Sequence, residues 1–137
     1  MRSGIARMTE RDCPFCKPDS GRILAAEDLA FAYLDGHPVS PGHALIVPRR
    51  HVHSWFHLHE DERAAMLRLL DAIRERLVVQ HRPDGFTLGI NDGAAAGQTV
   101  PHVHLHVIPR HSGDSPDPRG GVRWVLPEKA DYWSAKK

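Results

Sequence analysis

The chain has 137 residues, a formal net charge of +1 and eleven histidines. The length suits one domain with one core, and the small net charge argues against a protein that coats nucleic acid. Since no apolar run is long enough for a signal peptide or a membrane span, we expect a soluble, cytoplasmic protein without a membrane or nucleic-acid partner.

The N-terminal part of the chain combines a polar stretch with a pair of cysteines. Residues 1–12 are expected to form a flexible N-terminus, before a domain that spans residues 13–126. The cysteines, Cys13 and Cys16, are either half of a zinc site, which needs two further soft ligands, or a redox pair, which needs a helix directly after it. The turn-like residues 17–21 favour zinc; two unligated cysteines under a loop in a reducing compartment are the plain alternative.

The following segments predict an antiparallel sheet with one long helix. The helix is expected over residues 61–80, where apolar side chains recur at three- and four-residue spacing. Strands are expected over residues 22–26, 29–34, 43–48, 86–90 and 122–126. A C-terminal tail, residues 127–137, follows the last of them. Together these elements predict an α+β fold.

Residues 102–107 form a row in which three histidines alternate with valine and leucine. This alternation is typical of a β-strand, whose successive side chains point to opposite faces, so the three imidazoles are expected to share one face. The backbones of His102 and His106 would then lie about 13 Å apart, too far for both to bind one metal ion. The turn before the row, residues 97–100, begins with a glycine, which lets backbone approach a ligand closely.

The histidine row has four interpretations: a solvated face, a metal site, a catalytic site, or a nucleotide-binding site without turnover. The strict spacing argues against the first, and the distance along the strand argues against the second. In the third, His104 attacks phosphorus, His106 donates to a phosphate oxygen, and backbone N–H groups of residues 97–100 bind the developing negative charge. The fourth interpretation uses the same contacts.

The row and its surroundings resemble the histidine triad superfamily of nucleotide hydrolases and transferases. Residues 102–108 match its His-φ-His-φ-His-φ-φ motif, residues 97–100 match the Gly-Gln-Thr-Val segment before it, and residues 41–43 match its Pro-Gly-His segment. The likeness runs from Cys13 to about Arg123. It implies a five-stranded antiparallel sheet with one long helix, in a homodimer that binds a small-molecule nucleotide.

The resemblance implies roles for single residues. His104 matches the nucleophile that forms a nucleotidyl-imidazole intermediate at the α-phosphate, and His106 matches the histidine that contacts this phosphate. His43 matches an additional active-site histidine, and Asp35 matches a residue that binds the ribose hydroxyls. The nucleotide-binding positions together are Asp35, Asn91, Gly97, Gln98, Thr99 and His106.

The resemblance also supplies partners for the two cysteines. In bacterial members with a Cys-x-x-Cys pair, zinc is bound by both cysteines, a histidine after the buried strand and the first histidine of the triad. The matching residues are Cys13, Cys16, His51 and His102. Four protein ligands are typical of a structural zinc site, so structural Zn²⁺ is the cofactor that the resemblance implies.

The branch of the superfamily follows from two features. His106 stands where the nucleotidyltransferase branch has glutamine, which favours hydrolysis. The segments around the triad most resemble the fragile histidine triad branch, which predicts a hydrolase that attacks the α-phosphate of diadenosine tri- or tetraphosphate-like substrates. The alternatives are a purine nucleoside phosphoramidase and a non-catalytic nucleotide-binding regulator. A third class, a metal-storage protein, would bind several ions weakly.

Overall fold

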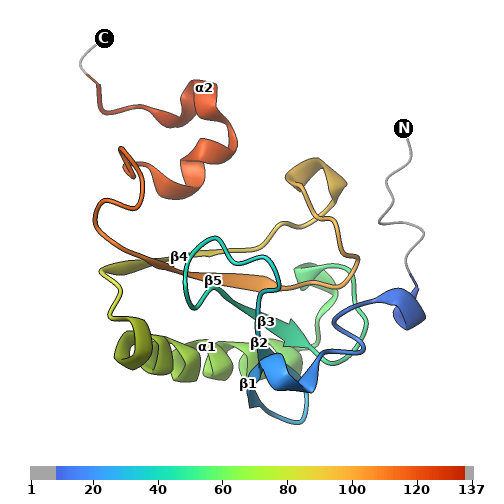
Figure 1. Ribbon diagram of the computed structural model, residues 1–137. Helices are drawn as coiled ribbons and strands as arrows, with labels where there is room; N and C mark the ends of the chain where they lie inside the picture. Colours follow the sequence, from blue (N-terminus) through green and yellow to red (C-terminus); the bar gives the residue numbers. More distant parts are fainter. Residues whose placement is uncertain (1–8, 135–137) are drawn as a thin grey trace.

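The computed structural model describes residues 9–134, in which a five-stranded antiparallel sheet packs against one long helix (Figure 1). The strands are β1 (Ile23–Ala26), β2 (Ala30–Leu34), β3 (Ala44–Pro48), β4 (Gly85–Gly89) and β5 (Leu105–Arg110). Their order in the sheet is β1-β2-β3-β5-β4, so β1 and β4 are its edges. The helices are α1 (Glu60–His81) and the short α2 (Pro127–Ala130). This architecture confirms the predicted α+β fold.

Helix α1 covers one face of the sheet because one stripe of its surface is apolar. The buried apolar residues of this stripe are Ala65, Met66, Leu69, Ile73 and Leu77, and they pack against apolar side chains of β2, β3 and β5. At its N-terminus, the buried Glu62 accepts hydrogen bonds from the His59 backbone N–H and the Arg50 guanidinium. The helix dipole also stabilises a carboxylate at this position.

Within residues 9–134, no helix combines the length and the apolar character needed to cross a bilayer.

Buried apolar residues alternate along the whole histidine row, although only the second half of the row lies in strand β5. Val103, Leu105 and Val107 are buried in the core under α1, whereas His106 lies on the other face, opposite Leu45 of β3. The prediction of one strand across the whole row is wrong, however, because β5 begins only at Leu105. The paired strand β3 ends at Pro48, and the N–H of Val103 donates instead to the carbonyl of Val52 in the loop. His102 and His104 therefore precede the ladder.

The C-terminal part of the chain differs from the prediction. Residues 122–126 do not form a strand; a 3-10 turn, η6 (Gly121–Val125), stands there and leads into α2. The reason is local, since Gly120 and Gly121 both adopt positive φ, which turns the chain sharply, and Arg123 then donates to the carbonyl of Ala130. In Figure 1 this segment extends away from the sheet on the side opposite α1.

The other predicted elements are confirmed, with ends shifted by one residue. Of the predicted flexible N-terminus, residues 1–8 lie outside the described residues, and η2 (Glu10–Asp12) is a single 3-10 turn.

Candidate functional site

A cavity of about 630 Å³ opens on the face of the sheet that His106 and Leu45 share, away from α1. Segments at the ends of several strands build its wall, so residues that are far apart in the sequence meet there. The predicted site residues that line it are Asp35, Asn91, Gly97, Thr99, His104 and His106. One cavity thus brings together the proposed nucleophile and most of the predicted nucleotide contacts.

The ring of His104 is oriented by a backbone carbonyl. Its Nδ1 lies 2.9 Å from the carbonyl oxygen of His102, and a carbonyl oxygen only accepts, so Nδ1 carries the proton. Nε2 therefore keeps its lone pair. The ring is buried, and its centroid lies 5.0 Å from that of Phe15. Burial lowers the pKa of His104, so the neutral, nucleophilic form is favoured.

His106 and His43 form a chain of hydrogen bonds with a defined direction. The backbone N–H of Val39 donates to Nδ1 of His43 at 3.1 Å, which leaves the His43 proton on Nε2. That Nε2 lies 3.0 Å from Nδ1 of His106 and 3.4 Å from a carboxylate oxygen of Asp35. Because Nδ1 of His106 accepts, its own proton is on Nε2. His106 is thereby prepared to donate a hydrogen bond to a ligand.

The direction of these hydrogen bonds decides whether Asp35, His43 and His106 can bind a metal. Their potential ligand atoms lie within 4.8 Å of one another, as in a metal site. A metal ligand needs a free lone pair, however, and the hydrogen bond from Val39 fixes the proton of His43 on the nitrogen that faces the other two residues. The arrangement therefore suits a hydrogen-bond relay rather than an ion.

The second cluster is formed by Cys13, Cys16, His51 and His102, and its geometry, unlike that of the first, suits a metal ion. All four potential ligand atoms lie within 4.8 Å of one another. Nδ1 of His102 lies 3.4 Å from Sγ of Cys13 and 3.6 Å from Sγ of Cys16, and Nδ1 of His51 lies 3.1 Å from Sγ of Cys16. Tetrahedral zinc with ordinary bond lengths separates sulfur and nitrogen ligands by about 3.5 Å. The cluster therefore has the dimensions of a metal site.

The protonation of this cluster also fits a metal. Nε2 of His102 lies 2.7 Å from the carbonyl oxygen of Pro48, so it donates there and leaves the Nδ1 lone pair facing the sulfurs. Burial lowers the pKa of His102 to about 4, which keeps the ring neutral. Burial, followed by the hydrogen bond with Cys13, raises the pKa of Cys16 to about 12. A bound cation would compensate for that cost of forming a thiolate.

The structure gives Gln98 a different place from the other predicted nucleotide contacts. Its side chain is buried, accepts from the backbone N–H of Gly93 and donates to the carbonyls of His53 and Val100. It therefore holds the loop in shape, while Gly97, with φ of +92°, turns the backbone toward the cavity. Gln98 is not one of the described residues that line the cavity.

Several lining residues were not expected from the sequence, above all Phe15 and Arg22. A signal for Phe15 existed, since it lies between two predicted metal ligands whose cluster includes a triad histidine. No comparable signal marked Arg22, because the contacts that bring its side chain to the cavity come from the next strand. Three further histidines, His53, His57 and His59, are exposed.

Comparison with known proteins places these features in a family. The family model described as HIT domain matches residues 19–113. The bifunctional bis(5'-adenosyl)-triphosphatase/adenylylsulfatase FHIT of Arabidopsis thaliana is 38% identical over 98 residues, which cover 72% of this chain and 54% of that protein. The chain thus spans about half the length of this curated relative.

Two solved structures resemble the fold closely. A HIT family protein from Bacillus anthracis is 33% identical, with a TM-score of 0.71 over 77% of this chain and 78% of that one. A Zn-bound histidine triad family protein from Mycobacterium smegmatis is 32% identical, with a TM-score of 0.68 over 80% of this chain and 86% of that one. The second shows that a histidine triad protein of similar fold binds zinc.

We expect His106 to titrate far below an ordinary histidine. Burial, with the nearby His104 and His43, lowers its pKa to about 4, against an opposing effect of Asp35. The neutral ring should therefore persist as the pH falls through 6.5 and gain its second proton only near the lowered pKa. An NMR titration of the imidazole, assigned with the His106→Gln variant, measures this. Protonation near the ordinary pKa of 6.5 would contradict it.

Proposed function

Because this chain belongs to the HIT family, we propose that it is a nucleotide hydrolase that attacks the α-phosphate of dinucleoside polyphosphates. The observation that carries the proposal is the tautomer of His104, whose Nδ1 is committed to the His102 carbonyl and whose Nε2 lone pair is free. His104 also lines a cavity large enough for a nucleotide. The name of the Arabidopsis relative, a bis(5'-adenosyl)-triphosphatase, supports this substrate class.

The first chemical step forms a bond between Nε2 of His104 and the α-phosphorus. The bond from phosphorus to the bridging oxygen breaks, and its electron pair leaves with the departing nucleotide. The ring becomes a cation, which the His102 carbonyl stabilises through the Nδ1 proton. Nε2–H of His106 donates to a non-bridging phosphate oxygen, and the relay from Val39 through His43 holds it in that protonation state.

The second step returns the enzyme to its starting state. Water attacks the phosphorus of the nucleotidyl-histidine and releases one proton to solvent, the bond to Nε2 breaks, and its electron pair returns to His104 as the lone pair. Around this centre, Asp35 is proposed to bind the ribose hydroxyls, and Asn91, Gly97 and Thr99 are proposed to surround the phosphates. Gln98 contributes by holding their loop.

Other leaving groups on the same α-phosphate are the second candidate. The Arabidopsis relative is also named an adenylylsulfatase, which supports including adenylylsulfate among the candidate substrates. A purine nucleoside phosphoramidase and a non-catalytic regulator use the same contacts. A panel of diadenosine tri- and tetraphosphate, adenylylsulfate and adenosine phosphoramidate ranks these functions directly.

Replacing the proposed nucleophile should abolish turnover and leave binding intact. We expect His104→Asn to lower the hydrolysis rate by roughly 10³-fold or more, because no other group supplies the attacking lone pair. Nucleotide binding and the unfolding midpoint should change little. His57→Asn, at an exposed histidine, is the matched control.

Two results would count against this mechanism. One is a His104→Ala variant that hydrolyses at the wild-type rate. The other is a wild-type protein that binds nucleotides but shows neither turnover nor a nucleotidyl adduct on His104 in single-turnover experiments, which would favour the regulator.

We further propose that Cys13, Cys16, His51 and His102 bind one structural Zn²⁺. Bound there, the ion would cross-link the N-terminal segment, the loop after β3 and the segment before β5, which stabilises the fold.

Purification without chelator should yield about one zinc per chain, and Cys16→Ser should lower the unfolding midpoint by about 5 °C or more. Chelator should then have no further effect on that variant. The site would be refuted by a zinc-free wild-type protein whose unfolding midpoint does not change when zinc is added. Several weakly bound ions would favour metal storage instead.

A homodimer is also proposed, in line with the family resemblance. The edge strand β4 exposes Leu88, and the neighbouring α1 exposes Leu67, so this side of the molecule presents apolar surface next to unpaired backbone groups. Sedimentation velocity at micromolar concentration should show a dimer that Leu88→Glu dissociates. Leu29→Glu, between the strands β1 and β2, is the control. A wild-type monomer under these conditions would contradict the proposal.

A further inference from the structure

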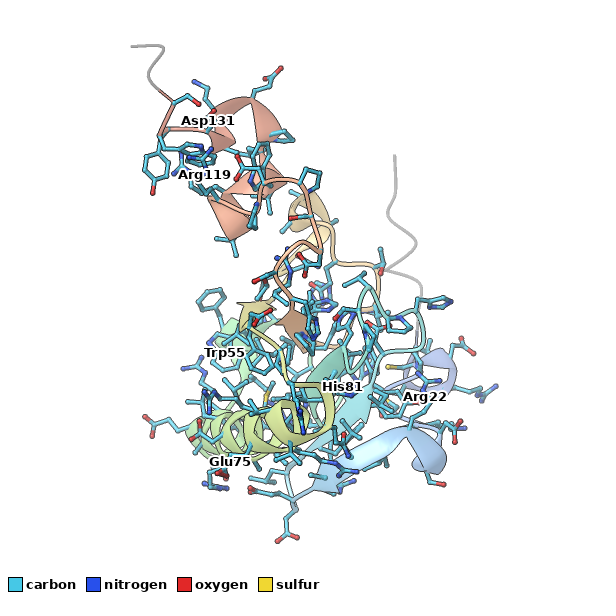
Figure 2. All side chains as sticks on the ribbon, turned by 60° about the vertical axis from the view of Figure 1, so that its left-hand side comes forward. Arg22, Trp55, Glu75, His81, Arg119 and Asp131 are labelled. Atoms are coloured by element: carbon cyan, nitrogen blue, oxygen red, sulfur yellow. The ribbon has the colours of Figure 1, made fainter. Side chains whose placement is uncertain are left out.

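One cationic side chain, Arg22, stands in the wall of the proposed nucleotide cavity among the lining residues that the structure describes. Arg22 ends the 3-10 turn η3 (Ser20–Arg22), directly before β1. Figure 2 labels it where the blue N-terminal segment enters the sheet. Neither the hydrolysis mechanism nor the zinc cluster gives it a task.

The guanidinium of Arg22 is held in a fixed orientation. Its Nε donates to the carbonyl of Leu34 at 3.2 Å, and its Cζ lies 4.5 Å from the centre of the Tyr33 ring. A Cβ added at Gly36 would lie 2.9 Å from Nη2, so the glycine leaves the space that the guanidinium occupies. Within residues 9–134, the two terminal nitrogens have no hydrogen-bond partner. Their donors are therefore pre-positioned and available to a ligand.

The order of the strands places Arg22 at the end of the cavity away from the phosphate chemistry. The guanidinium lies over Tyr33 of β2, and two strand spacings, about 10 Å in total, separate β2 from β5, which carries His106. Asp35 directly follows β2, and its carboxylate lies 3.4 Å from Nε2 of His43, which in turn contacts His106, so the carboxylate stands between the guanidinium and His106. This step rests on the proposed function: with the α-phosphate at His104 and His106 and the ribose at Asp35, the base extends toward Arg22.

The chemistry of a guanidinium then distinguishes between purines. Two adjacent N–H donors match two adjacent acceptors, and the O6 and N7 atoms of guanine are such a pair. Adenine presents N7 beside an amino group, whose hydrogens face the donors of the arginine. We infer that Arg22 reads the base and selects 6-oxopurine nucleotides, those with guanine or hypoxanthine, over adenine nucleotides. The chemistry at the α-phosphate is unaffected, but the preferred base differs from the adenosine named for the Arabidopsis relative.

Calorimetric titration of the full chain with GMP, IMP and AMP tests the inference without requiring turnover. GMP and IMP should both bind about 10-fold or more tightly than AMP, because both carry O6 and N7. Arg22→Gln should reverse the order, since a glutamine amide pairs with N6 and N7 of adenine. Arg22→Lys, whose ammonium can still donate to O6 and N7 but without the planar fork, should keep GMP ahead of AMP at a smaller ratio than the wild type.

Three results would overturn the inference. The first is wild-type protein that binds AMP as tightly as GMP. The second is IMP behaving like AMP, because the 2-amino group would then carry the preference. The third is an equal loss of affinity for all three nucleotides in both variants, which would make Arg22 a phosphate contact.

Failure of the proposed function would look different, because wild-type protein would then bind none of the three nucleotides. Thermal unfolding checks that the variants fold. If Arg22→Gln does not fold, the ratio measured for Arg22→Lys decides alone.

Discussion

The hydrogen bond from Nδ1 of His104 to the carbonyl oxygen of His102 is the contact on which the chemistry of the site depends. A buried carbonyl that loses its donor costs about 1–3 kcal/mol, so this bond holds the ring in one orientation and one tautomer. The lone pair of His104 is thereby confined to Nε2. Nearby, the backbone N–H of Val39 sets the opposite tautomer in His43 and, through it, in His106. Backbone groups thus give chemically equivalent imidazoles different tautomers, which suit the proposed nucleophile, His104, and the proposed donor, His106.

The same residue, His102, joins this site to the cysteine cluster. Its ring donates to the carbonyl of Pro48 and faces the two sulfurs, while its own carbonyl holds His104. Phe15, between the two cysteines in the sequence, lies within ring contact of both histidines and lines the cavity. The segment that carries the cysteines therefore also shapes the wall of the proposed nucleotide cavity. The position of the cysteine cluster depends on β3 ending at Pro48, where the chain leaves the ladder.

The sequence predicted the structural features that depend on local residue patterns, and it missed those that depend on contacts between residues far apart in the chain. Alternation correctly placed Val103, Leu105 and Val107 in the core, and the spacing of apolar residues correctly placed α1. The start of β5 was missed because it depends on a bond between Val103 and Val52, in a loop far away in the sequence. For the same reason the buried side chain of Gln98 and the approach of Arg22 to Tyr33 had no signal in the sequence. The division of the histidine row was inferred from a resemblance; the carbonyls of Pro48 and His102 give it a physical cause.

The central claim is that backbone partners divide the histidines by tautomer, and long-range ¹H–¹⁵N correlation spectra of the imidazole rings at neutral pH measure this most directly. The account predicts a proton on Nδ1 of His104 and on Nε2 of His43 and His106. A proton on Nε2 of His104 would contradict it, because the nitrogen that is proposed to attack phosphorus would then have no lone pair.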